Sequence, residues 1–305
     1  MASDSTPRHL DPRTLDRIRR LDVRARLVVE GFLTGQHQSP YHGFAVEFAS
    51  HREYVPGDDI RHIDWKVWSK TDRLYIKEYE EETNLRCQLL VDCSRSMDYG
   101  SKSDWSKFDH AATAAASLAY LLQQQQDSVG LLTFGNAIRT QVRPAAGPNH
   151  IRQLLHVLET TKPDETTDVG KVFRDVAGQL KQRGLVAIFS DLFVDEATLR
   201  ESLERFRHRG HEVIVFQVMH SDELRFPFDE NTLFKGMEQS VQLYAEPRSL
   251  RKAYLESVER FLERTRSVCG GLGIDHVMVD TAEPLDAVLA RYLAFRQRVR
   301  RRARR

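Results

Sequence analysis

The sequence predicts an α/β fold built on a doubly wound, mostly parallel sheet, and two observations lead to that prediction. From about residue 84, short apolar segments alternate with longer segments of helical periodicity. This alternation is typical of parallel sheets whose two faces are covered by helices. Polar residues follow the apolar segments directly, as expected where loops leave the carboxyl ends of parallel strands.

Short segments that contain apolar residues mark the expected strands. Leu85–Val91 is the first, and Ser128–Phe134 is the second. Ala137–Val142 follows across Gly135-Asn136, which predicts an antiparallel hairpin. Further strands are expected at 185–189, 212–218 and 274–279, and a short hairpin from 232–234 and 240–243.

Helices are expected between these strands. Phe108–Gln126 is rich in Ala and Leu, and further helical segments are expected at 149–159, 169–182, 196–207, 249–268 and 285–300. An earlier helix is expected after Asp11-Pro12, which supplies a cap and a first-turn proline. Its apolar residues recur from Leu15 to Phe32, and Gly35 ends it.

The chain divides into three parts on these grounds. Residues 1–83 hold the first helix, an irregular aromatic segment and a strand at Leu74–Tyr79, and are expected to pack on the main domain. Residues 84–295 form the α/β domain, and residues 296–305 form a tail with seven Arg. Interleaved charges between Arg52 and Asp64 favour either a buried ion-pair network or a partner-binding surface.

The composition is that of a soluble globular protein. Of 305 residues, 41% are hydrophobic and 29% are charged, with a net charge of +1 that gives no general attraction to nucleic acid or membrane. The N-terminus is polar, unlike a signal peptide, and no apolar window is long enough to span a membrane. The cysteines are scattered without a C-x-x-C pair, so a reducing, cytoplasmic location is expected. They are Cys87, Cys93 and Cys269.

Oxygen-bearing side chains follow two of the expected strands and open one expected helix. Asp92-Cys93-Ser94-Arg95-Ser96 comes after the first strand, Ser190-Asp191 follows the strand at 185–189, and Thr166-Thr167-Asp168 precedes a helix. Carboxylates and hydroxyls suit Mg²⁺, with Mn²⁺ or Ca²⁺ as alternatives. Hydroxyls would bind directly, and the two Asp could hold coordinating waters. The predicted metal ligands are Asp92, Ser94, Ser96, Thr167 and Asp191.

The same residues permit a purely structural role. Asp and Ser after a strand often form an Asx turn or cap the next helix. The agreement of three segments in order and placement favours the metal site. One coordination position of the metal would face outward, and a carboxylate of a partner protein could occupy it. Thr166 is an alternative to Thr167, which fits the helix-opening pattern Thr167-Asp168-Val169-Gly170 better.

Common catalytic signatures are absent from the sequence, so a non-enzyme is expected. Neither a G-x-x-x-x-G-K-[ST] loop nor a G-x-S-x-G elbow occurs. Cys93 has no neighbouring His base that would make it a nucleophile. Two alternatives remain: an Mg²⁺-dependent phosphohydrolase with Arg95 as the charge-stabilising group, and binding of nucleic acid or an anionic surface by Arg296–Arg305.

Asp92-x-Ser94-x-Ser96, Thr167 and Asp191 resemble the metal-ion-dependent adhesion site of von Willebrand factor A domains. Upstream blocks resemble a narrower bacterial group, the domain of unknown function 58 family, and the similarity runs from about residue 25 to 240. The blocks are Gly43–Phe48, Arg52–Trp65 and Tyr75–Glu78. Many relatives carry N-terminal membrane segments, which this sequence does not show. It also has Glu165-Thr166 where a glycine often precedes the threonine.

The resemblance implies a sheet of von Willebrand factor A type and a protein-interaction role. Members of the family are commonly encoded beside MoxR-type AAA+ ATPases. The implied partner is therefore such an ATPase, its client protein, or both, with this chain as an adaptor in chaperone-like protein maturation.

Overall fold

The computed structural model describes residues 20–37, 51–55, 67–68, 73–77, 85–100, 105–164, 166, 168–238, 241–286 and 289. The chain forms two compact units, one comprising residues 1–34 and 85–305 and the other residues 35–84. The first unit holds the sheet and the candidate site.

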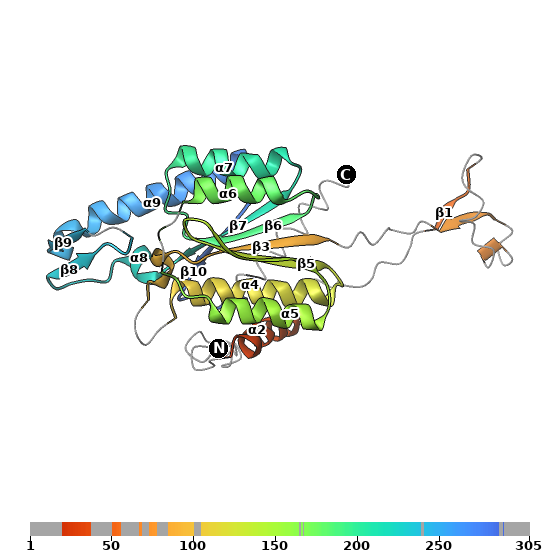
Figure 1. Cartoon of the computed structure of the whole chain (residues 1–305), viewed down its shortest axis with the longest axis horizontal. Coiled ribbons are helices and arrows are strands. Elements are labelled where there is room, and N and C mark those ends of the chain that lie inside the picture. Colours follow the sequence, from red (N-terminus) through yellow and green to blue (C-terminus); the bar gives the residue numbers. More distant parts are fainter. Residues whose placement is uncertain are drawn as a thin grey trace, which may run out of the picture. The chain divides into compact units, whose positions relative to one another are not determined.

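A six-stranded sheet forms the centre of the first unit, in the order β10-β7-β6-β3-β4-β5 (Figure 1). All neighbouring strands are parallel except β4 and β5, which form the expected antiparallel hairpin. The predicted doubly wound, mostly parallel sheet is therefore confirmed. Its strands are β3 (Arg86–Asp92), β4 (Ser128–Phe134), β5 (Ile138–Ala145), β6 (Leu185–Ser190), β7 (Glu212–Met219) and β10 (Asp275–Asp280).

Both faces of the sheet are buried, which explains why its central strands read as continuous apolar runs. Successive side chains of a strand point to opposite faces. Leu89 and Val91 accordingly lie in one core, and Leu90 lies in the other. Helices α4 and α5 cover the first face, and α2 packs on the outer side of these two helices (Figure 1). Helices α6, α7 and α9 cover the second face (Figure 1).

The covering helices match the predicted ones to within a few residues at each end. They are α4 (Lys107–Gln124), α5 (Pro148–Thr160), α6 (Val169–Gln179), α7 (Glu196–His208) and α9 (Pro247–Gly271). The N-terminal helix α2 (Leu21–His37) is observed from residue 21, and its expected beginning lies outside the described residues. Of the expected last helix, only Leu285, Asp286 and Leu289 are described, all in helical conformation.

Helix α4 is positioned by its first turn. The Ser106 hydroxyl accepts the backbone N–H of Asp109, and the Asp109 carboxylate accepts the backbone N–H of Ser106. This reciprocal capping satisfies N–H groups that have no partner inside the helix. It fixes the direction in which the next residue, Lys107, projects.

Two short elements were not expected from the sequence. The 3₁₀ helix η3 (Arg95–Asp98) follows β3, and α8 (Ser221–Arg225) follows β7. Elements of four or five residues are too short to show a periodic pattern. Both lie at the carboxyl end of the parallel strands, where the candidate site is.

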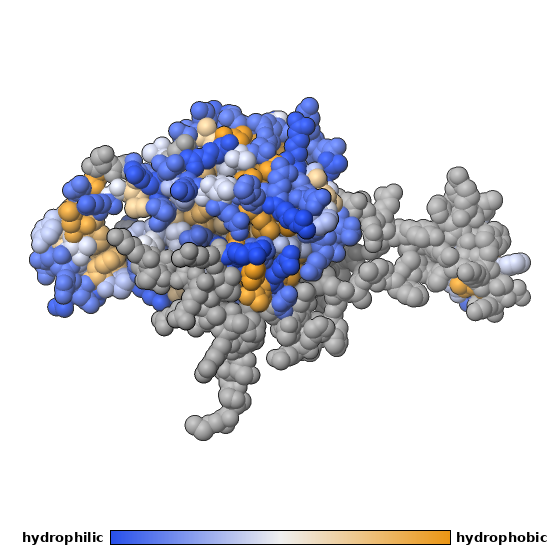
Figure 2. Space-filling view, turned by 60° about the horizontal axis from the view of Figure 1, so that its bottom comes forward, coloured by the Kyte–Doolittle hydropathy of each residue, from blue (hydrophilic) through white to orange (hydrophobic). Residues whose placement is uncertain are grey.

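A small hairpin extends the same end of the sheet, as the sequence predicted. Strands β8 (Thr232–Lys235) and β9 (Gln242–Ala245) pair antiparallel beside α9 (Figure 1). Phe226, Phe228, Phe234 and Tyr254 pack together beneath it. Several apolar side chains of the hairpin and of the start of α9 are exposed, and Figure 2 shows hydrophobic surface at this end. These side chains are Leu233, Val241, Leu243, Tyr244 and Leu250.

The second unit contains one described sheet. Strands β1 (His51–Glu53) and β2 (Tyr75–Lys77) pair antiparallel, with Arg52 opposite Ile76. The strand expected at Leu74–Tyr79 is observed at Tyr75–Lys77, and its last two positions lie outside the described residues. Most of the charged block from Arg52 to Asp64 lies outside the described residues, and the expected packing of this unit on the main domain stays a prediction.

No helix in the described ranges combines the length and the apolar character that crossing a bilayer requires.

Candidate metal centre

Asp92 is the last residue of β3, and the candidate centre begins at this residue. Its side chain is buried, with the residue 1% exposed. Oδ1 accepts the backbone N–H of Ser94 at 2.9 Å, and Oδ2 accepts the Ser190 hydroxyl at 2.6 Å. The first bond is an Asx turn, so the structural role considered for this motif is real. The turn also brings the following serines back towards the carboxylate.

Ser94 and Ser96 place two hydroxyls side by side. Ser94 is fully buried, and the two Oγ atoms lie 3.0 Å apart. Ser94 stands at the cap position of η3, but its side chain makes no capping hydrogen bond. Its hydroxyl interacts instead with the Ser96 hydroxyl and with the Asp92 carboxylate.

Asp191 reaches the same edge of the sheet from the neighbouring strand. Strands β3 and β6 are parallel, with Val91 opposite Phe189, so Asp92 and Asp191 both lie just past that pair. Asp191 is buried, and its Oδ1 accepts the backbone N–H of Phe193 at 3.3 Å. The parallel register thus unites two of the predicted segments.

The threonine segment lies at the end of the adjoining strand β4. The backbone N–H of Asp168 donates to the carbonyl oxygen of Gly135, just past β4, at 3.3 Å. The Asp168 side chain caps α6 through the N–H of Lys171. Thr166 is exposed, and Thr167 lies outside the described residues. The role of Thr167 as a ligand stays a prediction.

Asp92 is a buried carboxylate close to a second carboxylate. Burial, and next the negative charge of Asp191, raise the pKa of Asp92 to about 7. The hydrogen bonds from Ser190 and Ser94 oppose this rise. Within the described part of the chain Asp92 forms no salt bridge. Two buried carboxylates close together repel each other, and a nearby cation reduces this cost; the Lys107 ammonium already contacts Asp191.

The donor set fits a hard divalent cation. Each candidate ligand presents oxygen, which suits Mg²⁺ and disfavours metals that prefer sulfur or imidazole. No three His, Cys, Asp or Glu side chains come together as a metal-binding group among the residues described. Any ion at this edge would therefore depend on the serine hydroxyls as well as on the carboxylates.

Lys107 is a component of the site that the sequence did not reveal. Its ammonium contacts Asp191 and also Glu223 of α8, each at 2.8 Å. In the sequence it is an ordinary lysine at the start of a helix. The only signal was the Ser-x-x-Asp capping pattern of residues 106–109, which sets where the residue points. Its second partner belongs to α8, which was not predicted.

His110, one turn further along α4, gives the protein a defined sensitivity to acid. Burial lowers the pKa of His110 to about 4 from an ordinary value of 6.5. The unfolded chain therefore takes up a proton below about pH 6.5, while the folded protein does not until about pH 4. The stability contributed by neutral His110 is present above pH 6.5 and is lost as the pH falls towards 4.

We expect His110→Gln to weaken that acid dependence. Between pH 7.5 and 5, wild type should lose about 2 kcal/mol more unfolding free energy than the variant. Urea unfolding at the two pH values measures this difference. His156→Gln, at an exposed position of α5, should match wild type. Parallel losses in all three proteins would contradict the role of His110.

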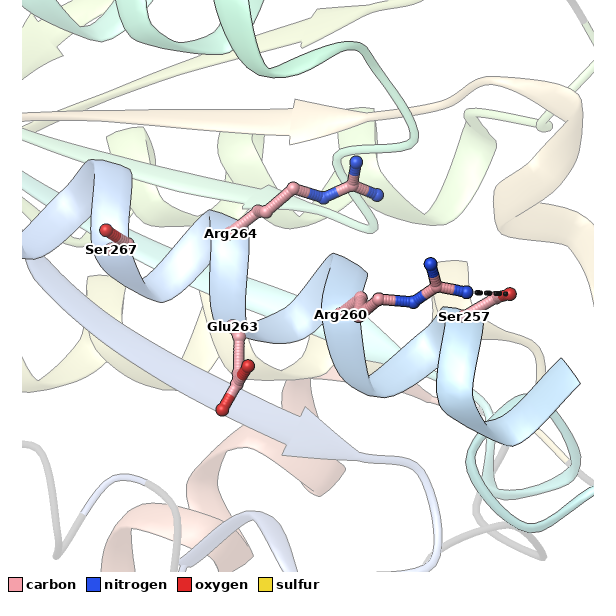
Figure 3. A pocket seen from close by; sticks show the side chains of 5 residues that line it. All are labelled: Ser257, Arg260, Glu263, Arg264 and Ser267. Atoms are coloured by element: carbon pink, nitrogen blue, oxygen red, sulfur yellow. Dashed lines mark hydrogen bonds between the residues drawn. The ribbon is translucent and has the colours of Figure 1, made fainter. Parts of the chain in front are cut away.

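A surface hollow along α9 lies apart from the centre. Figure 3 shows its five lining side chains, all from this one helix. The Arg260 guanidinium donates to the Ser257 hydroxyl at 3.1 Å, and Arg264 projects from the next turn. The lining also holds one carboxylate, Glu263, between the two arginines.

The fold and the site together define a class of protein. A parallel sheet with one antiparallel edge, and Asp and Ser side chains at the carboxyl ends of adjacent central strands, are the features of a von Willebrand factor A-type α/β protein. The family model described as "Protein of unknown function DUF58" matches residues 50–264. The chain belongs to this family.

Two curated relatives match the chain at low identity and to different extents. The uncharacterized protein Rv1480 of Mycobacterium tuberculosis is 25% identical over 293 residues, covering 94% of this chain and 91% of that protein. The uncharacterized protein YeaD of Bacillus subtilis is 24% identical over 156 residues, covering 50% of this chain and 36% of that protein.

Solved structures resemble the chain more distantly. An aerotolerance-related membrane protein from Bacteroides fragilis has a TM-score of 0.45 at 16% identity, covering 69% of this chain and 99% of that one. The conserved hypothetical protein BatB from Bacteroides thetaiotaomicron has a TM-score of 0.43 at 14% identity, covering 69% and 97%. The VWA domain of SpRpn10 has a TM-score of 0.40 at 12% identity, covering 68% and 94%.

Proposed function

We propose that this chain is a non-enzymatic interaction protein that binds its partners through a divalent metal at the carboxyl ends of β3 and β6. The convergence of Asp92, Ser94 and Ser96 with Asp191 at one buried edge carries the proposal. Mg²⁺ is the proposed ion, with Mn²⁺ or Ca²⁺ as substitutes.

The proposed roles of the ligands follow from their hydrogen bonds. Ser94 and Ser96, with Thr167, would bind the ion directly through hydroxyl oxygens. Both oxygens of Asp92 already accept hydrogen bonds, as do both of Asp191, which suits carboxylates that act through bound water. A bound metal would supply a Lewis-acidic position for an acidic side chain of the partner.

The surroundings of the centre suit a protein partner. Phe193, two residues past Asp191, is 50% exposed. The hairpin at the same end of the sheet exposes further apolar side chains, of which Tyr244 is 69% exposed. Exposed apolar surface rimmed by polar groups is typical of protein-binding sites.

Family resemblance supplies the proposed partner. Members of the family are commonly encoded beside MoxR-type AAA+ ATPases, so we propose such an ATPase, or its client, as the bound protein. The chain would then act in the cytoplasm as an adaptor in chaperone-like maturation.

Affinity capture from the native cell tests the proposal. Wild type and Asp92→Ala are each used as bait with Mg²⁺ and with EDTA, and retained proteins are identified by mass spectrometry. We expect an AAA+ ATPase with metal-loaded wild type and in no other arm. Asp175→Ala, on the exposed side of α6, is the control and should behave as wild type. Retention in all arms would contradict docking at the metal centre.

The phosphohydrolase alternative needs a cation that reaches a phosphoryl group. Lys107 lies beside the centre but is fully buried between two carboxylates, so it does not favour this function. Arg95 is exposed on η3 and remains the candidate group. Phosphoester turnover by wild type that Asp92→Ala abolishes would support the enzyme instead.

A further inference from the structure

Lys107 is a buried cation beside the candidate metal centre. It lies in the first turn of α4, and its side chain is 0% exposed. Its Nζ lies 2.8 Å from Asp191 Oδ2 and 2.8 Å from Glu223 Oε1. The ammonium also lies over the ring of Phe193, 4.8 Å from the centroid. The ammonium is therefore surrounded by groups from the segment after β6 and from α8.

Both carboxylates that bind Lys107 are themselves fixed. Asp191 Oδ1 accepts the backbone N–H of Phe193 at 3.3 Å. Glu223 Oε2 accepts the backbone N–H of His220 at 2.8 Å, within the capping box of α8. Moving the ammonium away would break its hydrogen bonds to both carboxylates in a buried place, which is unfavourable. Its charge is thus a permanent part of the centre.

A fixed positive charge beside Asp191 opposes the binding of a second cation. The affinity of an oxygen site for a hard divalent ion rises with the negative charge of its ligands. Lys107 cancels part of the charge that Asp191 would otherwise offer, and like charges repel strongly where water is excluded.

We propose that Lys107 sets the metal affinity of the centre. Its ammonium keeps Mg²⁺ binding by the free protein weak, and tight binding requires the further negative charge of a partner carboxylate. This inference rests on the proposed function and adds a regulation to it. Metal and acidic partner then bind cooperatively, each raising the affinity of the protein for the other.

Mg²⁺ titration by isothermal calorimetry tests this role without any partner. Lys107→Met is expected to bind Mg²⁺ at least about tenfold more tightly than wild type. Glu223→Gln is expected to bind it several-fold more weakly, because it removes negative charge and leaves the ammonium. Lys252→Met removes the same charge at an exposed position of α9 and should bind as wild type does. A purely structural lysine would not produce these opposite changes.

The two variants keep the proposal falsifiable. The Lys107→Met variant has buried carboxylates with no ammonium beside them, which disfavours folding. The variant is therefore refolded in the presence of Mg²⁺. Glu223→Gln retains the Lys107–Asp191 pair and carries the test alone if the first variant does not fold. Mg²⁺ binding by Lys107→Met that equals or falls below that of wild type overturns the proposal, as does unchanged binding by Glu223→Gln.

The outcomes also separate this proposal from the proposed function. Mg²⁺ binding that appears only in Lys107→Met would support the charge-setting role. Absence of binding in wild type and Lys107→Met alike, with both folded, would overturn the metal centre and this inference together. Binding by wild type with no change in either variant would leave the metal centre standing and overturn only the role of Lys107.

Discussion

Asp92→Asn should make the metal-free protein more stable while abolishing its response to Mg²⁺. In EDTA at pH 8 we expect the variant to gain roughly 2–4 kcal/mol in unfolding free energy. The wild-type carboxylate is buried beside Asp191, whereas asparagine can keep both hydrogen bonds without the charge. Ser190 would accept from the new amide in place of donating to the carboxylate. Urea unfolding with and without Mg²⁺ measures both effects.

The pH dependence gives this prediction a second, independent signature. Because the pKa of Asp92 is raised to about 7, the folded protein holds a proton that the unfolded chain releases above about pH 4. Wild type therefore loses stability as the pH rises from about 4 to 7, and the advantage of Asp92→Asn grows over that window. Asp175→Asn, an exposed control with the same change of charge, should show no such trend. Equal stability of wild type and Asp92→Asn in EDTA would contradict the argument.

Gly184→Ala is the second large effect expected, and it acts from the opposite end of the strands. Gly184 precedes β6, and a Cβ there would fall well inside contact distance of the Arg86 carbonyl oxygen on β3. Because the obstacle is backbone, the two strands must separate. We expect a loss of about 3 kcal/mol, or roughly 10 °C in melting temperature. The same separation would disturb the register that brings Asp92 and Asp191 together, so Mg²⁺ stabilisation should shrink as well.

Gly178→Ala is the matched control, because it makes the same substitution in open space. Gly178 lies in α6, and no atom comes within 4 Å of a Cβ built there. Alanine favours a helix over glycine by about 0.5–1 kcal/mol, so this variant should be slightly stabilised. Differential scanning calorimetry of both variants, with and without Mg²⁺, provides the comparison. A Gly184→Ala protein as stable as wild type would contradict the predicted clash.

The sheet and its long helices could be predicted because each left a strong local pattern. The strands buried on both faces are short and mostly apolar, and the helix α4 is a long segment rich in Ala and Leu. Because ligand-binding loops follow the carboxyl ends of parallel strands, the sequence alone predicts that Asp92 and Asp191 lie at one edge of the sheet. Their shared position is a consequence of the parallel register of β3 and β6.

The charge balance of the site could not be predicted. Lys107 is surrounded by groups 84 and 116 residues away in the sequence, and one of them lies on a helix of only five residues. The sequence shows that residue 107 is a lysine, but it does not show which carboxylates the lysine contacts in the folded protein. The sequence likewise predicted the serine motif. It did not show that Ser94 would stand at the cap position of η3 without a capping hydrogen bond from its side chain.

The pairing of β3 with β6 has a consequence for the order of events during synthesis. The hydrogen bond from Ser190 to Asp92 spans 98 positions along the chain. A growing chain emerges from the ribosome N-terminus first, so Asp92, Ser94 and Ser96 appear long before β6. Until β6 has been synthesised, β3 can pair with β4 along one edge, and its other edge has no partner strand. The proposed centre is therefore completed late, and a metal bound there would report that the two halves of the sheet have already joined.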